Sequence, residues 1–215
     1  MNEISAGLQA FIEIIQQIAD NKYVLGDRLV EIGISGPNLE ATLASIAMAQ
    51  GELGHARLLY NWAFDLQGLE GKKPEIEDQT GRAFSSVVSI DNWFDLITSV
   101  YAVNEALELV LQDILEANHS EVAHRIHKLL KEQKEHIIYS RNWVRQLLKD
   151  KGAIPHKCNE GLEKAIPDAL NWLNKIEQDS ALIAEGYRLA DRNLVKRFQG
   201  RIDQLREEMD VSHVV

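Results

Sequence analysis

The stretch Ala49-Gln50-Gly51-Glu52-Leu53-Gly54-His55-Ala56-Arg57 carries two metal-ligand side chains in the middle of a long helical pattern. Glu52 and His55 are three residues apart, so on a helix they project from one face about a turn apart. This is a spacing with which the helices of a bundle hold iron or manganese. An acidic helix also shows Glu-x-x-His by chance. The meaning of the pair therefore depends on what faces it from other helices.

Two long helices are predicted in the first part of the chain. Apolar residues recur at alternating spacings of three and four over residues 4–33 and again over 38–67, as in bundle helices. A short turn centred near residue 36 joins them, which makes them antiparallel neighbours. Lys22 interrupts the apolar stripe of the first helix, and Glu52 lies inside the second. Counted from the turn, Lys22 and Glu52 fall within one helical turn of each other and can meet.

A second hairpin follows a crossover loop at residues 68–90, which has a short apolar piece near its end. Helices are predicted over about 91–117 and from 120 to about 150. Asn104 interrupts the apolar stripe of the first of these helices, and Gln133 interrupts that of the second. The two positions are mirror images about the turn, so both polar residues are expected at one level of this hairpin.

The predicted fold class is all-α. The chain is expected to form one domain, residues 1–215, with a ferritin-like four-helix bundle over 4–150 and a crossover loop. Two further helices, at about 160–177 and 179–209, form a C-terminal helical pair (160–209) that covers one side. An apolar stripe on the last of these helices favours self-association through outer helix faces.

Several polar residues outside the stripes are expected at the surface. They are Glu105, Glu108, Glu132 and Glu135 beside the third and fourth stripes, Arg188 in the last helix, the lone thiol Cys158, and the histidines His119, His124 and His127. Charged helical residues are usually solvated, and none of these histidines has a second metal-ligand signal beside it.

The four inward stripes lose their apolar character near mid-length, where they supply six polar side chains. These are Lys22, Glu52, His55, Asn104, Gln133 and His136. One residue, a pair at i and i+3, one residue and another pair at i and i+3 is the ligand layout of a ferritin-like di-iron site. Unrelated polar residues scattered in a core would not fall at matched levels in both hairpins. An altered metal site is therefore predicted.

Four motifs carry a resemblance to a known family. They are Asp20-Asn21-Lys22-Tyr23-Val24-Leu25, Gly36-Pro37-Asn38-Leu39-Glu40, Leu53-Gly54-His55-Ala56-Arg57, and Lys131-Glu132 through His136 with Tyr139-Ser140-Arg141-Asn142-Trp143. The chain resembles the phenylacetic acid catabolic proteins, the ferritin-like subunits of the bacterial phenylacetyl-CoA epoxygenase complex. The likeness covers roughly residues 8–150 and is strongest to the non-catalytic structural subunit.

The resemblance implies an incomplete ligand set. Three residues match ligand positions of the family's catalytic subunit, namely Glu52, His55 and His136. Three others stand where that pattern has carboxylates, namely Lys22, Asn104 and Gln133. A register shift could recruit Glu132 or Glu105 in their place. The chain also keeps the Glu-x-x-His that the structural subunit tends to lose, so it stands between the two.

The summed charge of the six-residue cluster also argues against a di-iron site. Four carboxylates with two neutral histidines sum to about −4, which a bundle tolerates only when two divalent cations balance it. Here the positive Lys22 balances the negative Glu52, and the amides and neutral imidazoles add nothing. Such a pair can satisfy itself without iron. No cofactor is expected, and iron or another divalent metal would bind only at sub-stoichiometric occupancy.

Three functions remain open. The leading hypothesis is a catalytically silent ferritin-like subunit of a phenylacetyl-CoA epoxygenase-type multicomponent monooxygenase, with a degenerate di-iron site. The second is a divergent metal-dependent oxygenase or oxidase that uses Glu52, His55 and His136. The third is a stand-alone homodimeric bundle that binds a small ligand. The expected partners are accordingly a second copy of the chain, a catalytic ferritin-like oxygenase subunit, or both.

Composition limits the possible binding partners and the cellular location. The net charge of −10 argues against nucleic acid, because phosphate binding needs a basic face. No stretch approaches the about 20 apolar residues of a membrane span, and the start of the chain lacks a signal-peptide pattern. One cysteine excludes an internal disulfide, so a cytoplasmic location is expected.

Overall fold

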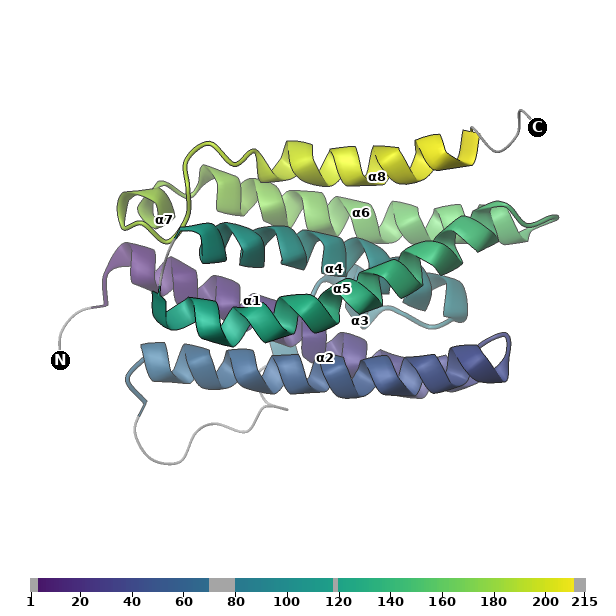
Figure 1. The fold of residues 1–215 in the computed structure, drawn as a ribbon, viewed down its shortest axis with the longest axis horizontal. Coiled ribbons are helices and arrows are strands. Elements are labelled where there is room, and N and C mark those ends of the chain that lie inside the picture. Colours follow the sequence, from purple (N-terminus) through teal and green to yellow (C-terminus); the bar gives the residue numbers. More distant parts are fainter. Residues whose placement is uncertain (1–3, 70–79, 118–119, 211–215) are drawn as a thin grey trace.

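The computed structural model describes the chain over residues 4–69, 80–117 and 120–210. Within these ranges it contains helices and no strand, as the sequence predicts (Figure 1). The elements are α1 (Ala6–Glu31), the 3₁₀ turn η1 (Gly33–Ser35), α2 (Leu39–Leu66), α3 (Ser85–Val88), α4 (Trp93–Glu116), α5 (Ser120–Leu148), α6 (Ile154–Gln178), α7 (Ser180–Ala184) and α8 (Leu194–Asp210). The expectation of a ferritin-like bundle with added C-terminal helices is confirmed.

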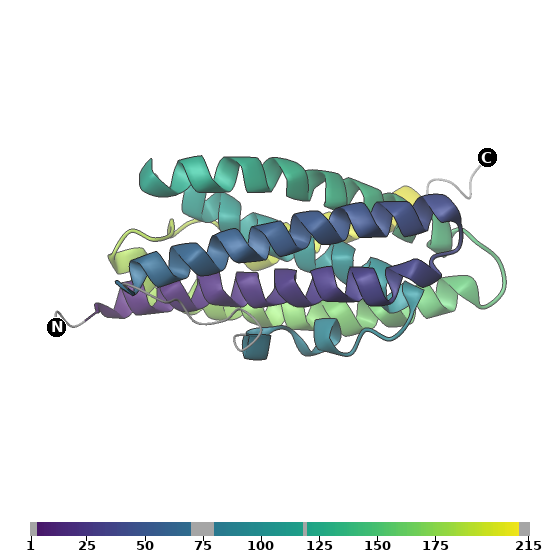
Figure 2. The same cartoon turned by 90° about the horizontal axis from the view of Figure 1, so that it is seen from below.

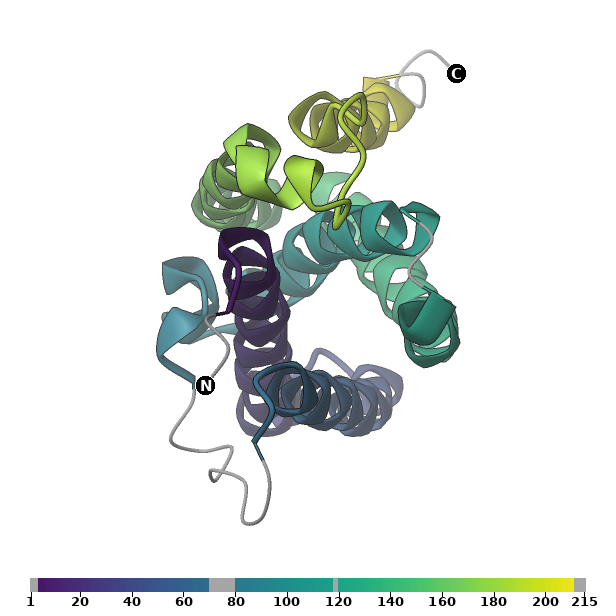
Figure 3. The ribbon, with the colours of Figure 1, turned by 90° about the vertical axis from the view of Figure 1, so that its left-hand side faces the viewer.

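Four helices form the bundle and three cover one side of it. Figure 3 looks along the helices and shows α1, α2, α4 and α5 around a common axis. Helix α1 packs chiefly on α2, and α4 packs on α5 as well as on α6. The C-terminal helices α6, α7 and α8 lie against α1 and α4. Helix α2 lies on the opposite side, away from them (Figures 1 and 2).

Local sequence signals set the helix ends. Asn38 accepts a hydrogen bond from the main-chain N–H of Ala41, and Asn92 caps α4 in the same way. Such N-caps satisfy amides that have no partner inside the helix. At the tip of the first hairpin, a Cβ on Gly33 would overlap the side chain of Ser45. The close approach of η1 and α2 therefore requires glycine at this position.

The centre of the protein is α4, because other helices surround it. Twenty of its 24 residues are buried, including Glu105 and Glu108. The expectation that these two glutamates face water is wrong, because α8 covers that side of α4. Arg201 on α8 forms ion pairs with both carboxylates, the one to Glu108 at 2.6 Å. Burial raises the pKa of Glu105, and the Arg201 guanidinium opposes that rise.

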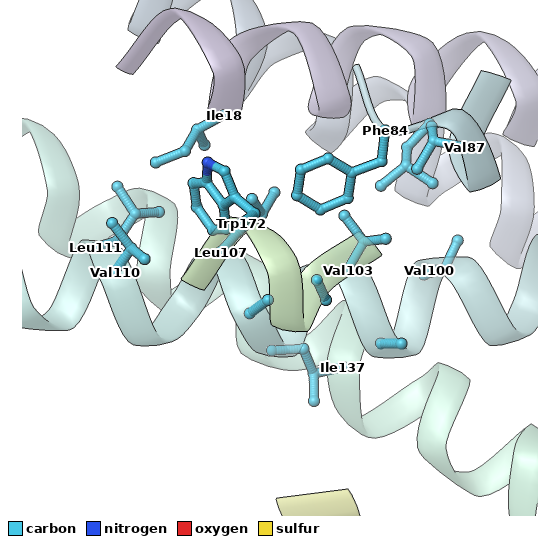
Figure 4. Close-up of a cluster of buried hydrophobic side chains, with 14 of the residues drawn as sticks. Ile18, Phe84, Val87, Val100, Val103, Leu107, Val110, Leu111, Ile137 and Trp172 are labelled. Carbon is cyan, nitrogen blue, oxygen red and sulfur yellow. The ribbon is translucent and has the colours of Figure 1, made fainter. Parts of the chain in front are cut away.

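The chain between α2 and α4 is anchored by two polar residues of α1. Asp20 accepts hydrogen bonds from the hydroxyl of Tyr60 (2.6 Å) and from the main-chain N–H of Arg82 (2.7 Å). Asn21 accepts from the main-chain N–H of Phe84 at 2.9 Å. The Phe84 ring then packs edge-on against Trp172 of α6, at 5.6 Å between centroids (Figure 4). The expected apolar piece of the crossover is thus α3 and its flanks, while residues 70–79 lie outside the described residues.

The single helix expected over 179–209 is wrong. The structure has the short α7 and then α8, separated by an irregular segment in which Gly186 and Asn193 have positive φ angles of 77° and 43°. Arg188, expected on an exposed face, is buried in this segment. Its guanidinium donates to Oδ2 of Asp113 (3.2 Å) and to the carbonyl of Glu177 at the end of α6 (2.9 Å). These contacts hold the segment against α4 and α6.

Two more surface expectations fail at the C-terminal helices. Cys158 is buried rather than exposed, because α6 begins at Ile154 and packs that residue against α5. Burial raises the pKa of the Cys158 thiol to about 12. The apolar stripe of α8 is also buried within the chain, through Leu194, Phe198, Ile202 and Leu205. It offers no surface for self-association.

Other expectations fall partly outside the described residues. His127 is exposed, as predicted, whereas His119 and the side chain of His124 lie outside the description. Within the described residues, no helix is long and apolar enough to cross a membrane.

Candidate functional site

The predicted polar cluster exists, and Glu52 is at its centre. The Lys22 ammonium lies 2.8 Å from Oε2 of Glu52 and 3.1 Å from Oδ1 of Asn104. The Asn104 amide donates to Oε1 of Glu52 at 2.9 Å. Gln133 donates to the main-chain carbonyl of Asn104 at 2.8 Å, which confirms that these two residues share a level. All four side chains are fully buried in the bundle.

The charge on Glu52 is held by its neighbours. Burial by itself raises the pKa of this carboxyl, since a charge is poorly solvated in a protein interior. The Lys22 ammonium and a hydrogen bond from His136 outweigh burial and hold the pKa of Glu52 well below its usual range. The carboxylate therefore stays ionised, with both oxygens occupied by nitrogen donors.

His136 is part of the cluster and needs a glycine beside it. Its Nδ1 lies 2.7 Å from Oε1 of Glu52, and because a carboxylate only accepts, Nδ1 carries the proton. The edge of the ring lies against Gly51 on α2. A Cβ at Gly51 would sit 2.8 Å from Cε1 and 3.0 Å from Nε2 of His136. The glycine in Gly51-Glu52 therefore makes room for the imidazole.

His55 turns outward from the cluster. Its Nε2 lies 2.8 Å from Oε2 of Glu132 on α5, while its buried Nδ1 has no hydrogen-bond partner among the described residues. Burial and the nearby Lys22 charge lower the pKa of His55 to about 4, so the ring is neutral at pH 7. Glu132 is less solvated than expected because it binds His55, whereas Glu135 is exposed as predicted.

The sequence-predicted ligands do not converge as a set. Glu52 and His136 are in contact, but the His55 nitrogen that has a partner faces Glu132, and the His55 and His136 rings are 6.1 Å apart between centroids. Glu105, the other proposed substitute, binds Arg201 on a different side of α4. Among residues 4–69, 80–117 and 126–208, no group of three or more His, Cys, Asp and Glu is placed to hold a metal ion.

The residues present do not fit a pair of iron ions. Hard and borderline cations need carboxylate and imidazole donors, and bridging carboxylates must balance their charge. Here an ammonium occupies the space between the two hairpins and contacts Glu52 and Asn104. The donor set has a single core carboxylate, already paired. What the cluster does is hold the two hairpins together at mid-length through buried, charge-assisted hydrogen bonds.

The fold and the paired levels of its two hairpins define the class of protein as a ferritin-like helical bundle. The family model described as "Phenylacetic acid catabolic protein" matches residues 2–213. The chain belongs to this family, and the match extends beyond the segment that carries the resemblance in sequence. One relative is a subunit of the 1,2-phenylacetyl-CoA epoxidase of Escherichia coli (strain K12). It is 25% identical over 191 residues, which cover 86% of this chain and 77% of the relative.

Several residues that shape the site were not found by sequence reasoning. Gly51 is adjacent to Glu52, but nothing in a single sequence says that a histidine from α5 will lie against it. In the sequence Asp20 and Asn21 stand out only as part of a family motif, yet they tie the crossover to α1 next to Lys22. Their polarity at positions adjacent to the buried stripe was the available signal.

Proposed function

We propose that the protein is a non-catalytic ferritin-like subunit of a phenylacetyl-CoA epoxidase-type multicomponent monooxygenase, acting in phenylacetate breakdown. Family membership and the relative that is itself one subunit of such an epoxidase support the pathway. The observation that carries the silent role is the contact of the Lys22 ammonium with Glu52 in the middle of the bundle. On this proposal the chain pairs with a catalytic ferritin-like subunit and supports its structure.

The chemistry of the cluster supports this role over a catalytic one. An ammonium repels cations, and the two amides at neighbouring ligand positions cannot supply the negative charge that divalent cations need. Both oxygens of Glu52 already accept short hydrogen bonds, from Lys22 at 2.8 Å and from His136 at 2.7 Å. A metal would have to displace these donors and leave the ammonium buried without a counter-charge, which is costly.

The other two functions have less support. A one-metal oxygenase using Glu52, His55 and His136 would need His55 to leave Glu132 and turn toward Glu52. A stand-alone homodimer that binds a small ligand would need a cavity at the cluster, and its interior donors and acceptors are mostly bonded to one another. The single cysteine in the sequence still favours a reducing cytoplasm as the location.

The test is reconstitution with the catalytic ferritin-like homologue from the same host. A variant that carries both Lys22→Met and Glu52→Gln removes the charged pair without leaving either charge unpaired. The complex with this variant should turn over phenylacetyl-CoA at the wild-type rate, and the chain alone should show no turnover. Loss of turnover in the complex, with the complex still assembled, would mean that this chain carries part of the chemistry.

The matched control places the same kind of change in the partner. Replacing a ligand carboxylate of the catalytic homologue should abolish turnover whether this chain is wild type or variant. If turnover persists, the active site is not in the partner, and the assignment of roles is reversed.

A further inference from the structure

Exposed apolar side chains gather at one end of the first hairpin. Ten large hydrophobic residues are exposed among the described residues, and half of them fall between positions 30 and 46. They are Val30, Ile34, Leu39, Leu43 and Ile46, which we call the tip face. Their exposed fractions range from 40% for Ile46 to 68% for Leu39. Single exposed apolar residues are normal, but a group of five in one place is not.

The tip face is built on well-formed structure. Leu39, Leu43 and Ile46 are at i, i+4 and i+7, so they lie along one side of α2. The side of α2 that faces the core carries Ala41 and Met48, which are buried. Helix α2 is therefore apolar on two sides, a pattern of helices that are covered all round. In this chain the side with Leu39, Leu43 and Ile46 is exposed.

The exposed area matches one half of a protein interface. The five side chains together expose on the order of 400 Å², which is the size of the largest apolar patch on a typical monomer, and such patches are often functional. One side of a stable interface covers about 800 Å², of which somewhat more than half is apolar. The tip face thus supplies most of the apolar part of such a contact.

The charges beside the tip face indicate which protein covers it. Asp27, Glu31 and Glu40 are exposed between positions 27 and 46, and the one base in that segment, Arg28, balances only Glu31, so the segment is acidic. A second copy of this acidic chain, with its net charge of −10, would bring two acidic rims together. A partner with an apolar helix face bordered by lysine and arginine would meet opposite charge.

We infer that the tip face is the surface through which the chain docks onto its catalytic ferritin-like subunit, and that this subunit presents an apolar helix face with a basic border. The inference rests on the proposed function for the identity of the partner. Apolar burial by Leu39, Leu43 and Ile46 supplies the affinity. The acidic residues beside the tip face speed the encounter with the partner and orient it.

The experiment measures binding of the purified chain to the purified catalytic homologue by calorimetry or surface plasmon resonance. Leu43→Lys should weaken binding by about 30-fold or more, because it places a charge at the centre of an apolar contact. The matched control is Ile138→Lys, a similarly exposed apolar residue on α5 outside the tip face. It should change the affinity less than about threefold, and both variants should melt like the wild type, since both side chains are exposed.

A second variant tests the acidic residues beside the tip face. Glu40→Lys should slow association several-fold at low salt, and the difference from the wild type should vanish at high salt, because exposed charges act through a screened field.

The outcomes distinguish a wrong docking surface from a wrong proposed function. If the wild type binds the homologue and Leu43→Lys binds equally well, the docking surface is wrong and the proposed function stands. If the wild type stays monomeric and does not bind the homologue, the proposed function itself fails. If the wild type dimerises and Leu43→Lys makes it monomeric, the occupant of the tip face is a second copy, and the inferred partner is wrong.

Discussion

The Lys22 ammonium lies 2.8 Å from Oε2 of Glu52, and neither side chain is exposed to solvent. The two residues come from neighbouring antiparallel helices, α1 and α2, at the level where ferritin-like proteins hold metal ions. Asn104 and His136 complete the hydrogen bonds of the carboxylate from the other hairpin. The arrangement connects α1, α2, α4 and α5 through one buried charged pair and its hydrogen bonds.

Removing one member of the pair should harm the fold more than removing both. Glu52→Gln leaves the buried ammonium without a counter-charge and should cost about 3–5 kcal/mol in the free energy of unfolding. Adding Lys22→Met to Glu52→Gln should recover much of that loss, since an apolar pair of similar volume is often close to neutral. Denaturant melts of the three proteins give the comparison. Glu31→Gln, which breaks the exposed pair with Arg28, is the control and should have little effect.

Equal losses in the single and the double variant would contradict this account. They would mean that the unpaired Lys22 ammonium is not the source of the loss in Glu52→Gln.

Two glycines of α2 should respond in opposite ways to alanine. Gly51→Ala places a Cβ 2.8 Å from Cε1 of His136 and should destabilise the protein by displacing that ring from Glu52. Gly54, one turn further along, has no atom within 4 Å of a built Cβ, so Gly54→Ala should stabilise α2 by about 1 kcal/mol through helix propensity. Thermal melts of the two variants test this. A stabilising Gly51→Ala would show that His136 does not lie against α2.

Stability should fall as the pH drops below about 6.5. The native pKa of His55 is about 4, below its ordinary value of 6.5, because the buried ring is poorly solvated as a cation. The native state therefore binds fewer protons than the unfolded chain between these values, and stability is lost at up to about 1.4 kcal/mol per pH unit. Below pH 4.5, Glu52 adds to the loss, because its pKa is also lower in the native state.

Denaturant melts from pH 7.5 to 4.5 measure this slope. His55→Gln should flatten it between pH 6.5 and 5, whereas the exposed His127→Gln should leave it unchanged. A slope that is the same in all three proteins would show that His55 is not the titrating group.

The level of the cluster could be predicted from sequence because helical period and turn position determine it. Counting from the two turns placed Lys22 beside Glu52 and Asn104 beside Gln133, and both pairs are in contact. The direction of His55 could not be predicted in this way. Its ring turns to Glu132, and that choice depends on a rotamer and on the position of α5.

The failures share one physical cause, which is coverage by helices distant in sequence. Glu105 is buried because α8 packs against α4, and Cys158 is buried because α6 packs against α5. Arg188 is buried because its segment lies against α4 and the end of α6. Glu105 is tolerated because Arg201 pairs with it. A single sequence shows which side of a helix is apolar, but it does not show which polar side meets a complementary charge elsewhere.

The measurement that tests the account most directly is metal-dependent stability of the wild type and of one triple variant. Lys22→Glu, Asn104→Asp and Gln133→Glu together restore carboxylates at three positions of the cluster. Without metal, this variant should be less stable than the wild type, because four carboxylates then share one interior. Added ferrous or manganous ion should stabilise the variant and leave the wild-type melt unchanged. A wild-type chain that gains stability and binds two metal ions would contradict the account, and so would a triple variant that gains nothing.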